Sequence, residues 1–433
     1  MSLADLEAFR RGSKDVCVVK APPGSGKTQL LVDAVPHWIH AGSSVIVTAL
    51  TNEQVDDICE RLGRANSELS VVRFTSSSHT VDRKLPANVS VVRNPRGLPT
   101  DYDILVSTTA KLAIGGCFKT FDAMFVDEAW QIGFKDLLPI TRFARRLVMI
   151  GDPGQIPPVK SVPHLRWDTS PFPPGEAMPE PFLRNALLRS SVDLVELKTC
   201  RRLPSDSVEL INLFYDFPFE AEAEPQERFL RAKPSKKGDA VDKALMSLSS
   251  RSTCIITTPT NRSIGIETDI ELAEVIASVV ERILRQTSAV RASPKEPASG
   301  RVLEPKDIGV SATHRAMNAA IRAAVTPRLL AAGLTVDTPE RWQGQQRPVM
   351  LIAHPLSGIE HPSGFDLETG RLCVMASRHQ SALLIFARDH VSETLDSHMP
   401  SATQSPGCPD SIGGGHAIHT KFWQFHRPAR IFG

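Results

Sequence analysis

The chain has 433 residues, of which 41% are hydrophobic and 23% are charged. These shares are ordinary for a soluble globular protein, and they exclude a disordered chain, a collagen-like chain and a coiled-coil rod. Lys and Arg number 50 against 48 Asp and Glu, so the net charge is only +2. This balance excludes a histone-like polycation, and a nucleic-acid site would have to come from local placement of groups. The length predicts two or three domains.

The first 156 residues alternate short β-rich runs with helical patterns, and we expect them to form one domain. The predicted strands are Val16–Lys20, Ser44–Thr48, Ile104–Thr108, Met124–Asp127 and Leu147–Ile150. The predicted helices are Lys27–His37, Asn52–Leu62 and Gly133–Arg145. Alternation at this spacing is typical of a parallel sheet with helices on both faces, so the fold class is α/β.

Residues 157–190 are rich in proline and predict a connector or a small insertion. Alternation resumes in residues 191–395, which we expect to form a second α/β domain. Its predicted strands are Val192–Leu197, Cys254–Thr258, Ile308–Ser311, Val349–Ala353 and Ala382–Phe386. Its predicted helices are Ser205–Phe214, Thr268–Leu284 with Thr268 as N-cap, and His314–Ala332.

Two polar stretches of the second domain, 221–239 and 287–300, predict exposed loops. Residues 396–433 predict a C-terminal tail in which Phe422–Phe425 packs back on the domain. The tail histidines His416, His419 and His426 have no Cys or carboxylate at ligand spacing, so we expect them to be solvated rather than metal-bound.

The cysteines and the apolar runs indicate the compartment. None of the seven cysteines forms a CxxC pair, and several lie in apolar runs, which is typical of buried thiols rather than of disulfides or zinc ligands. No apolar run reaches the roughly 18 residues of a membrane span, and the first residues lack an apolar signal core. We therefore expect a cytoplasmic protein, or a nuclear one in a eukaryote, with no membrane partner.

Residues 21–28 read Ala-Pro-Pro-Gly-Ser-Gly-Lys-Thr and lie between a predicted strand and a predicted helix. This is the context of a P-loop, in which backbone N–H groups surround the phosphates of ATP. The lysine brings a charge to the β- and γ-phosphates, and the threonine offers a hydroxyl to Mg²⁺. The predicted ATP-binding residues here are Pro23, Gly24, Ser25, Gly26, Lys27 and Thr28.

A P-loop needs a second, acidic element, and Phe-Val-Asp-Glu-Ala at 125–129 provides it at the end of a predicted strand. Asp127 is expected to hold Mg²⁺ together with Thr28. Glu128 is expected to act as general base toward the attacking water. Two adjacent carboxylates repel unless they share a cation, which favours this interpretation over a strand end that happens to be acidic.

With these elements placed, further segments follow in a known order, and the chain resembles the superfamily 1 helicases. The resemblance is to the branch that includes the nonsense-mediated-decay RNA helicase and the Dna-two replication helicase, and the C-terminal half is similar to the AAA_12 domain. It covers roughly residues 15–390. The segments that carry it, besides the P-loop and 125–129, are Val45–Asp56, Ser107–Ala110, Gly151–Pro158, Thr199–Pro204, Val336–Gln346 and Gly370–Arg378.

The resemblance implies two tandem RecA-like domains with ATP between them. The first would supply Gln155 as a sensor of the γ-phosphate, and the second would supply Arg201 and Arg378 as arginine fingers. Gly344 and Gln346 fall in the family's nucleotide-contacting QGxE segment, with Gln346 where glutamate is usual. The implied contacts to single-stranded nucleic acid are Thr48, Asn52, Thr108 and Thr109.

These assignments predict an ATP hydrolase that tracks along a single strand of DNA or RNA and couples closure of the domains to movement. These residues do not indicate whether the strand is DNA or RNA, because Thr and Asn contacts to the phosphate backbone do not distinguish ribose from deoxyribose. The alternative is a P-loop ATPase that acts as a switch, or as a non-unwinding subunit of a larger repair or defence complex. Trp130 and Trp342 are candidates for base stacking, although a core position is favoured for both.

Overall fold

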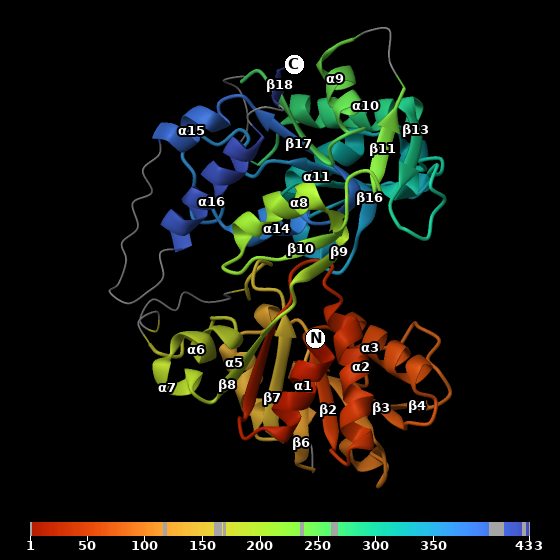
Figure 1. Ribbon diagram of the computed structural model, residues 1–433, viewed down its shortest axis with the longest axis vertical. Coiled ribbons are helices and arrows are strands. Elements are labelled where there is room, and N and C mark those ends of the chain that lie inside the picture. The colour runs from red at the N-terminus through yellow and green to blue at the C-terminus, as the bar shows by residue number, and fades with distance from the viewer. Residues whose placement is uncertain are drawn as a thin grey trace. The chain divides into compact units, whose positions relative to one another are not determined.

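The computed structural model describes residues 2–115, 119–159, 167, 170–233, 238–260, 267–397, 411–426 and 430–432. The chain divides into two compact units (Figure 1). Unit 1 contains Met1–Pro153 and Pro157–Lys198, and unit 2 contains Gly154–Ile156, Thr199–Gln404 and Cys408–Gly433. Each unit is described by itself below.

Unit 1 is built on an eight-stranded sheet in the order β4-β3-β5-β2-β6-β7-β1-β8, and every neighbouring pair is parallel. The strands are β1 Val16–Lys20, β2 Val45–Ala49, β3 Val71–Phe74, β4 Val89–Val92, β5 Ile104–Thr108, β6 Phe121–Val126, β7 Ala144–Gly151 and β8 Val192–Glu196. Its helices are α1 Ser2–Arg11, α2 Lys27–His40, α3 Asn52–Ala65, α4 Thr109–Gly115, α5 Phe134–Thr141, α6 Pro179–Arg184 and α7 Ala186–Arg189.

Alternate residues of each strand enter different apolar clusters, because successive side chains of a strand point to opposite faces. Cys17 and Val19 pack with residues of α1, α2 and α3. Val16 and Val18 pack with residues of α4 and α5. Helices therefore cover both faces, and the central strands read as continuous buried runs.

The strand β8 corrects the predicted domain boundary. It pairs in parallel with β1, Val16 lying opposite Val192, and so completes the sheet of unit 1. The assignment of Val192–Leu197 to the second domain was therefore wrong. The local pattern of apolar residues predicts that a segment is a strand, but it does not predict which distant strand that segment pairs with. The proline-rich stretch before β8 contains α6 and α7 in its described part, and it belongs to unit 1.

Unit 2 is built on a six-stranded parallel sheet in the order β15-β14-β16-β17-β12-β18. Its strands are β12 Thr253–Thr258, β14 Ile308–Ser311, β15 Thr335–Asp337, β16 Arg347–Ala353, β17 His379–Arg388 and β18 Arg430–Phe432. Its helices are α8 Ser205–Ile211, α9 Ala240–Ser247, α10 Ile270–Gln286, α11 Arg315–Ala324, α12 Pro327–Ala331, α13 Pro339–Trp342, α14 Thr369–Ala376, α15 Val391–Ser397 and α16 Ser411–Phe425.

This sheet is also covered on both faces. Cys254 and Ile256 of β12 enter a cluster with α9, α10 and α11, whereas Ile255 enters a cluster with α8, α14 and α16. The predicted α/β class, with parallel sheets flanked by helices, is confirmed in both units. In the described residues no helix is both long and apolar enough to cross a membrane.

The two predicted loops of unit 2 contain strands. β10, Glu220–Ala223, pairs in parallel with β9, Thr199–Pro204. β11, Phe229–Ala232, pairs antiparallel with β13, Thr287–Arg291. The prediction of loops was wrong for these residues, because short polar strands are stabilised by pairing with a distant partner rather than by their own pattern. Residues 234–237 lie outside the described part of the chain.

Two helix boundaries also differ from the prediction. The N-cap of α10 is Asp269 rather than Thr268, since the Asp269 carboxylate accepts from Leu272 N–H at 3.0 Å. The helix predicted over His314–Ala332 ends at Ala324 and restarts at Pro327. Proline restricts the residue before it to extended conformations, and Thr326 has ψ 125°.

The C-terminal helix α16 packs against unit 2 through Phe422 and Trp423, as predicted. Its histidines were wrongly expected to be solvated, because His419 and His426 are buried. The His354 and His419 rings lie 5.4 Å apart, edge to face. Burial lowers the pKa of His419 to about 3 and lowers that of His354 well below its usual value. No group of three His, Cys, Asp or Glu in the described ranges could hold a metal ion.

The remaining predictions about core residues concern cysteine and tryptophan. The five cysteines of the described chain are buried and form no disulfide, and Cys117 and Cys408 lie outside it. Trp130 and Trp342 are both buried. Their indole N–H groups donate to Glu180 at 2.6 Å and to Val310 O at 3.1 Å. Their role is structural packing, and neither offers an exposed face for base stacking.

Candidate nucleotide-binding site

The turn between β1 and α2 has the backbone of a phosphate-binding loop. Gly24 and Gly26 have φ values of 71° and 86°, a left-handed region that side chains with a Cβ rarely enter. Gly26 is the N-cap of α2, so the loop leads directly into a helix N-terminus with its free N–H groups. At its start the loop is joined to β7, since Ala21 N–H donates to Gly151 O at 2.8 Å.

The acidic pair lies beside this loop, because β6 ends at the same edge of the parallel sheet as β1. Lys27 Nζ is 2.8 Å from Glu128 Oε1. The Thr28 hydroxyl donates to Asp127 Oδ2 at 3.4 Å. Four of the predicted site residues, from two segments about a hundred positions apart, are thus brought together in unit 1.

Glu128 has a strained backbone. Its φ of 53° makes it the one non-glycine residue with positive φ in the described chain. Its N–H donates to Asp127 Oδ1 at 3.0 Å. Such conformations cost on the order of 1–3 kcal/mol, and they persist where the surrounding structure over-determines them, often at functional sites. No local sequence pattern predicts this turn.

Both carboxylates are removed from water, with 3% of Asp127 and 8% of Glu128 exposed. Burial and then the neighbouring Glu128 charge raise the pKa of Asp127 to about 7, and Lys27 opposes this shift. A carboxylate and a hydroxyl are hard oxygen donors of the kind Mg²⁺ prefers, and Mg²⁺ usually keeps several waters rather than an all-protein cage. Asp127 and Thr28 therefore fit this ion.

The segment predicted to sense the γ-phosphate is divided between the units. Asp152 follows β7 in unit 1, whereas Gly154–Ile156 belongs to unit 2. The ring of Tyr215 lies so close to Gly154 that a Cβ there would sit 2.5 Å from it, and Ile156 enters an apolar cluster of unit 2. Gln155 was expected in the first domain, but its neighbours in the chain pack with the second.

The two predicted arginine fingers, both in unit 2, have different environments. Arg201 on β9 is 58% exposed in its side chain and lies 3.8 Å from Glu222. Arg378, between α14 and β17, is only 1% exposed, and its Nε donates to Val374 O at 3.0 Å. Within the described residues its Nη2 has no acceptor. A buried donor without an acceptor is unfavourable, and an anion bound beside this guanidinium group would supply the missing acceptor.

The predicted nucleotide contacts Gly344 and Gln346 lie before β16. Gly344 has φ 76° and open space around its Cα. Gln346 Oε1 accepts from Arg202 Nε at 2.9 Å, and Arg202 Nη1 donates to Ser377 O at 3.1 Å. Arg202 was missed by sequence reasoning. The only signal for it was its position beside Arg201.

The predicted strand contacts of unit 1 are mostly buried. Thr48 is fully buried, and its hydroxyl has no partner in the described chain. Thr108 and Thr109 are buried as well, and Thr108 Oγ1 accepts from Lys111 N–H at 3.2 Å at the start of α4. Asn52, the first residue of α3, is half-buried and accepts from Arg73. Contact of these residues with nucleic acid stays a prediction.

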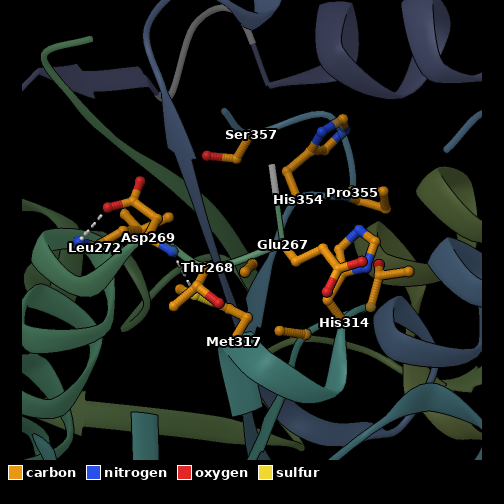
Figure 2. Close-up of a pocket in the computed structure, with 12 residues that line it drawn as sticks. Glu267, Thr268, Asp269, Leu272, His314, Met317, His354, Pro355 and Ser357 are labelled. Carbon is orange, nitrogen blue, oxygen red and sulfur yellow. Dashed lines mark hydrogen bonds between the residues drawn. The ribbon is translucent and has the colours of Figure 1, made fainter. Parts of the chain in front are cut away.

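A pocket lies in unit 2 at the carboxyl ends of β14 and β16, and Figure 2 shows its lining side chains, among them His314, Met317 and His354. Its cavity volume is about 30 Å³. One water needs roughly 10–15 Å³ of such space. The pocket therefore holds only a few waters and is too small for a nucleotide, although it lies at the sheet edge where α/β proteins bind ligands.

Comparison with known proteins gives the following likenesses. The AAA domain family AAA_30 matches residues 4–166. The DNA replication ATP-dependent helicase/nuclease DNA2 of Saccharomyces cerevisiae is 26% identical over 158 residues, which is 34% of this chain and 10% of that protein. The DNA2 protein of Mus musculus is 30% identical over 160 residues, covering 34% of this chain and 15% of its own length. The chain thus matches only a small part of these relatives.

Among solved structures, the arterivirus nonstructural protein 10 helicase matches with 17% identity and a TM-score of 0.46. The match covers 91% of this chain and 63% of the viral one.

Proposed function

We propose that this chain is a superfamily 1 helicase of the DNA2-like branch, an ATP-dependent motor that moves along single-stranded nucleic acid, and its likeness to the AAA_30 family and to the DNA2 proteins supports this. The observation that carries the proposal is the joining of the P-loop and the acidic pair in unit 1, where Lys27 and Glu128 are 2.8 Å apart. The steps below follow from what the residues at this site can do.

The loop of Gly24 and Gly26 and the N-terminus of α2 bind phosphate, because their N–H groups carry the partial positive charge that phosphate oxygens require. Lys27 moves its ammonium from Glu128 to the β- and γ-phosphates of ATP. Thr28 and Asp127 would hold Mg²⁺. When bound, Mg²⁺ neutralises charge that develops on the phosphoryl oxygens.

Glu128 acts as general base. In this structure its carboxylate is neutralised by Lys27. Once Lys27 pairs with phosphate, Glu128 is free to orient a water and to accept its proton. The site is buried, so this carboxylate has few competing solvent contacts and acts on a single positioned water.

Gln155, Arg201 and Arg378 complete the proposed machinery. The unused Nη2 of Arg378 supports a role as an arginine finger, since a guanidinium group stabilises charge in the transition state more than in the ground state. Arg201 is exposed enough to reach a ligand. Gln346 is held by Arg202 rather than free, so we assign it no direct contact to nucleotide before that hydrogen bond opens.

A second candidate is a nucleotide-driven switch that does not track along nucleic acid, acting with protein partners in a larger complex. The burial of Thr48, Thr108 and Thr109 favours it, because buried hydroxyls do not reach a strand without rearrangement. A cytoplasmic location also stays a prediction.

ATP hydrolysis measured with and without single-stranded oligonucleotides separates the two candidates. The motor predicts stimulation on the order of tenfold or more by DNA, RNA or both, and competition between matched strands identifies the sugar preference. Hydrolysis that no oligonucleotide changes would exclude the motor and support the switch. A duplex with a single-stranded tail then shows whether movement also unwinds base pairs.

A further inference from the structure

A buried arginine lies beneath the segment proposed to contact nucleic acid. Arg73 lies on β3, in the sequence Val-Val-Arg-Phe, and none of its surface is exposed. An arginine is almost never fully buried unless every donor is matched, because taking a charge out of water costs several kcal/mol per ion. The three hydrogen-bond partners of Arg73 therefore indicate which groups this residue orients.

The guanidinium group divides its donors among three acceptors. Its Nε donates to Asp56 Oδ1 at 2.6 Å, and its Nη1 donates to Phe74 O at 2.9 Å. Its Nη2 donates to Asn52 Oδ1 at 2.8 Å. Asp56 is itself fixed from the other side, as its Oδ2 lies 2.9 Å from His79 Nε2. The charge of Arg73 is thus neutralised by Asp56, and its remaining donors orient uncharged groups.

The contact to Asn52 fixes which end of that amide faces outward. Arginine has donors only, so the oxygen of the amide must face Arg73 and the assignment of oxygen and nitrogen is not ambiguous. The Nδ2 group, with two N–H donors, then points away from Arg73. In the described chain it has no acceptor, and Asn52 is half-buried at the start of α3.

A buried ion pair is weak evidence for stability, because apolar residues of similar volume often stabilise a fold as well or better. A stability role alone therefore does not explain why this strand carries arginine. A role in orienting Asn52 does explain the arginine. If the amide rotated freely, its oxygen would face a phosphate half of the time, and the two oxygens would repel each other.

We propose that Arg73 is a positioning residue that holds the Asn52 amide with Nδ2 outward, so that it donates to a phosphate oxygen of bound single-stranded nucleic acid. This inference rests on the proposed function. Arg73 itself does not touch the strand. The Asp56 carboxylate holds Arg73 in turn, and the network links β3 to the first turn of α3.

The test is a double-mutant cycle read by the affinity for a fluorescently labelled single-stranded oligonucleotide. Asn52→Ala is expected to weaken binding roughly tenfold, the scale of one hydrogen bond to a charged group. Because the asparagine is uncharged, the salt dependence of binding stays the same. Arg73→Lys keeps the positive charge beside Asp56 but loses the guanidinium Nη2 donor that reaches Asn52. It is expected to weaken binding severalfold. In the double variant the loss equals that of Asn52→Ala alone.

Asn52→Asp provides a variant that should fold even if Arg73→Lys does not. It keeps an oxygen for Arg73 and adds an ion pair, so the melting temperature is maintained, but it replaces the Nδ2 donor with a second oxygen. Binding is expected to fall further than in Asn52→Ala. Arg83→Lys is the matched control, because Arg83 pairs with Asp57 and Glu60 on the outer side of the same helix. It should bind as the wild type does.

Three results would overturn the inference. They are an Asn52→Asp protein that binds as tightly as the wild type, losses that multiply in the double variant, and an Arg73→Lys protein that melts earlier but binds normally. These outcomes are distinct from failure of the proposed function, in which the wild-type protein itself has no affinity for a single strand.

Discussion

The turn after β1 in unit 1 and the turn after β14 in unit 2 have the same place in two parallel sheets, but they differ in backbone. The first runs over residues 21–26 and contains Gly24 and Gly26 with positive φ. The second is only residues 312–314, Ala-Thr-His, and contains no glycine. Both lead into a helix, yet the second leaves room for only a few waters. Glycine and loop length, rather than the sheet, decide which turn surrounds phosphate.

A second difference concerns charge. The turn of unit 1 faces Asp127 and Glu128, which Lys27 and Thr28 contact directly. In unit 2, Asp269 beside the pocket is already paired with Arg388 at 2.8 Å. The charge of the Asp269 carboxylate is already neutralised by an arginine, so this carboxylate is less suited to binding a metal ion. The variants below test whether the residues of unit 1 carry the chemistry and whether those of unit 2, apart from the two proposed arginine fingers, have structural roles.

The largest effect is expected for Lys27→Ala. This change removes the cation that pairs with Glu128 and is proposed to bind the phosphates, so ATP turnover should fall on the order of 10³-fold or more. Steady-state phosphate release is the measurement. Lys14→Ala is the matched control, since Lys14 forms a half-exposed ion pair with Asp193 and should turn over ATP normally. Turnover retained in Lys27→Ala would place hydrolysis at another site.

The next effect is expected for Arg378→Ala, the exception to a purely structural unit 2. Loss of a transition-state partner should lower kcat on the order of 10³-fold while nucleotide affinity changes only a few-fold. Single-turnover hydrolysis and nucleotide titration give the two values. Arg341→Ala removes an arginine that is 77% exposed and should change neither. An equal loss in kcat and affinity would show that Arg378 binds the ground state.

A stability effect is expected at Gly309 in β14. A Cβ there would lie 2.5 Å from Met350 Sδ and would enter the Trp342 ring. Gly309→Ala should therefore destabilise the protein by about 1–3 kcal/mol in denaturant unfolding. Gly414→Ala is the same change at an exposed position of α16 with no neighbour, and it should stabilise by up to about 1 kcal/mol. Equal effects at both sites would contradict the packing described for β14.

The smallest effect concerns pH. Burial lowers the pKa of His419 and of His379 to about 3, so both are neutral when folded and gain protons only on unfolding. Their contribution to stability is present above the unfolded pKa of about 6.5 and is lost as pH falls below it. Between pH 7.5 and 5.5 each should cost about 1.4 kcal/mol of unfolding free energy.

Unfolding of His419→Leu at the two pH values checks this prediction, because the variant should lose one such contribution. His40 is largely exposed, so His40→Gln should keep the full dependence on pH. If His419→Leu and the wild type lose stability equally on acidification, His419 is not buried in its neutral form.

The elements that could be predicted from the sequence are those determined by a local pattern of apolar and polar residues. The strands Val16–Lys20, Ile104–Thr108 and Ile308–Ser311 were placed to the residue, because each is an apolar run bounded by polar residues or by a turn. β3 was missed, since Arg73 interrupts its apolar run and only distant partners explain its burial. β8 was assigned to the wrong domain for the same reason.

The candidate site shows the same division. The spacing of Gly24, Lys27 and Thr28 and the acidic pair at a strand end were sufficient to propose the site. The ion pair of Lys27 with Glu128 and the positive φ of Glu128 depend on how β1 and β6 lie in the sheet. The contacts of Arg202 join segments far apart in the chain, and those of Arg73 depend on how β3 lies against α3, so no local pattern predicts either set.

Displacement of streptavidin from the end of a biotinylated single strand tests the proposed movement most directly, because it requires tracking but no unwinding. The motor predicts ATP-dependent displacement from one end by the wild-type protein, and none by Lys27→Ala. If the wild-type protein hydrolyses ATP in the presence of the strand but displaces streptavidin from neither end, the protein does not move along nucleic acid.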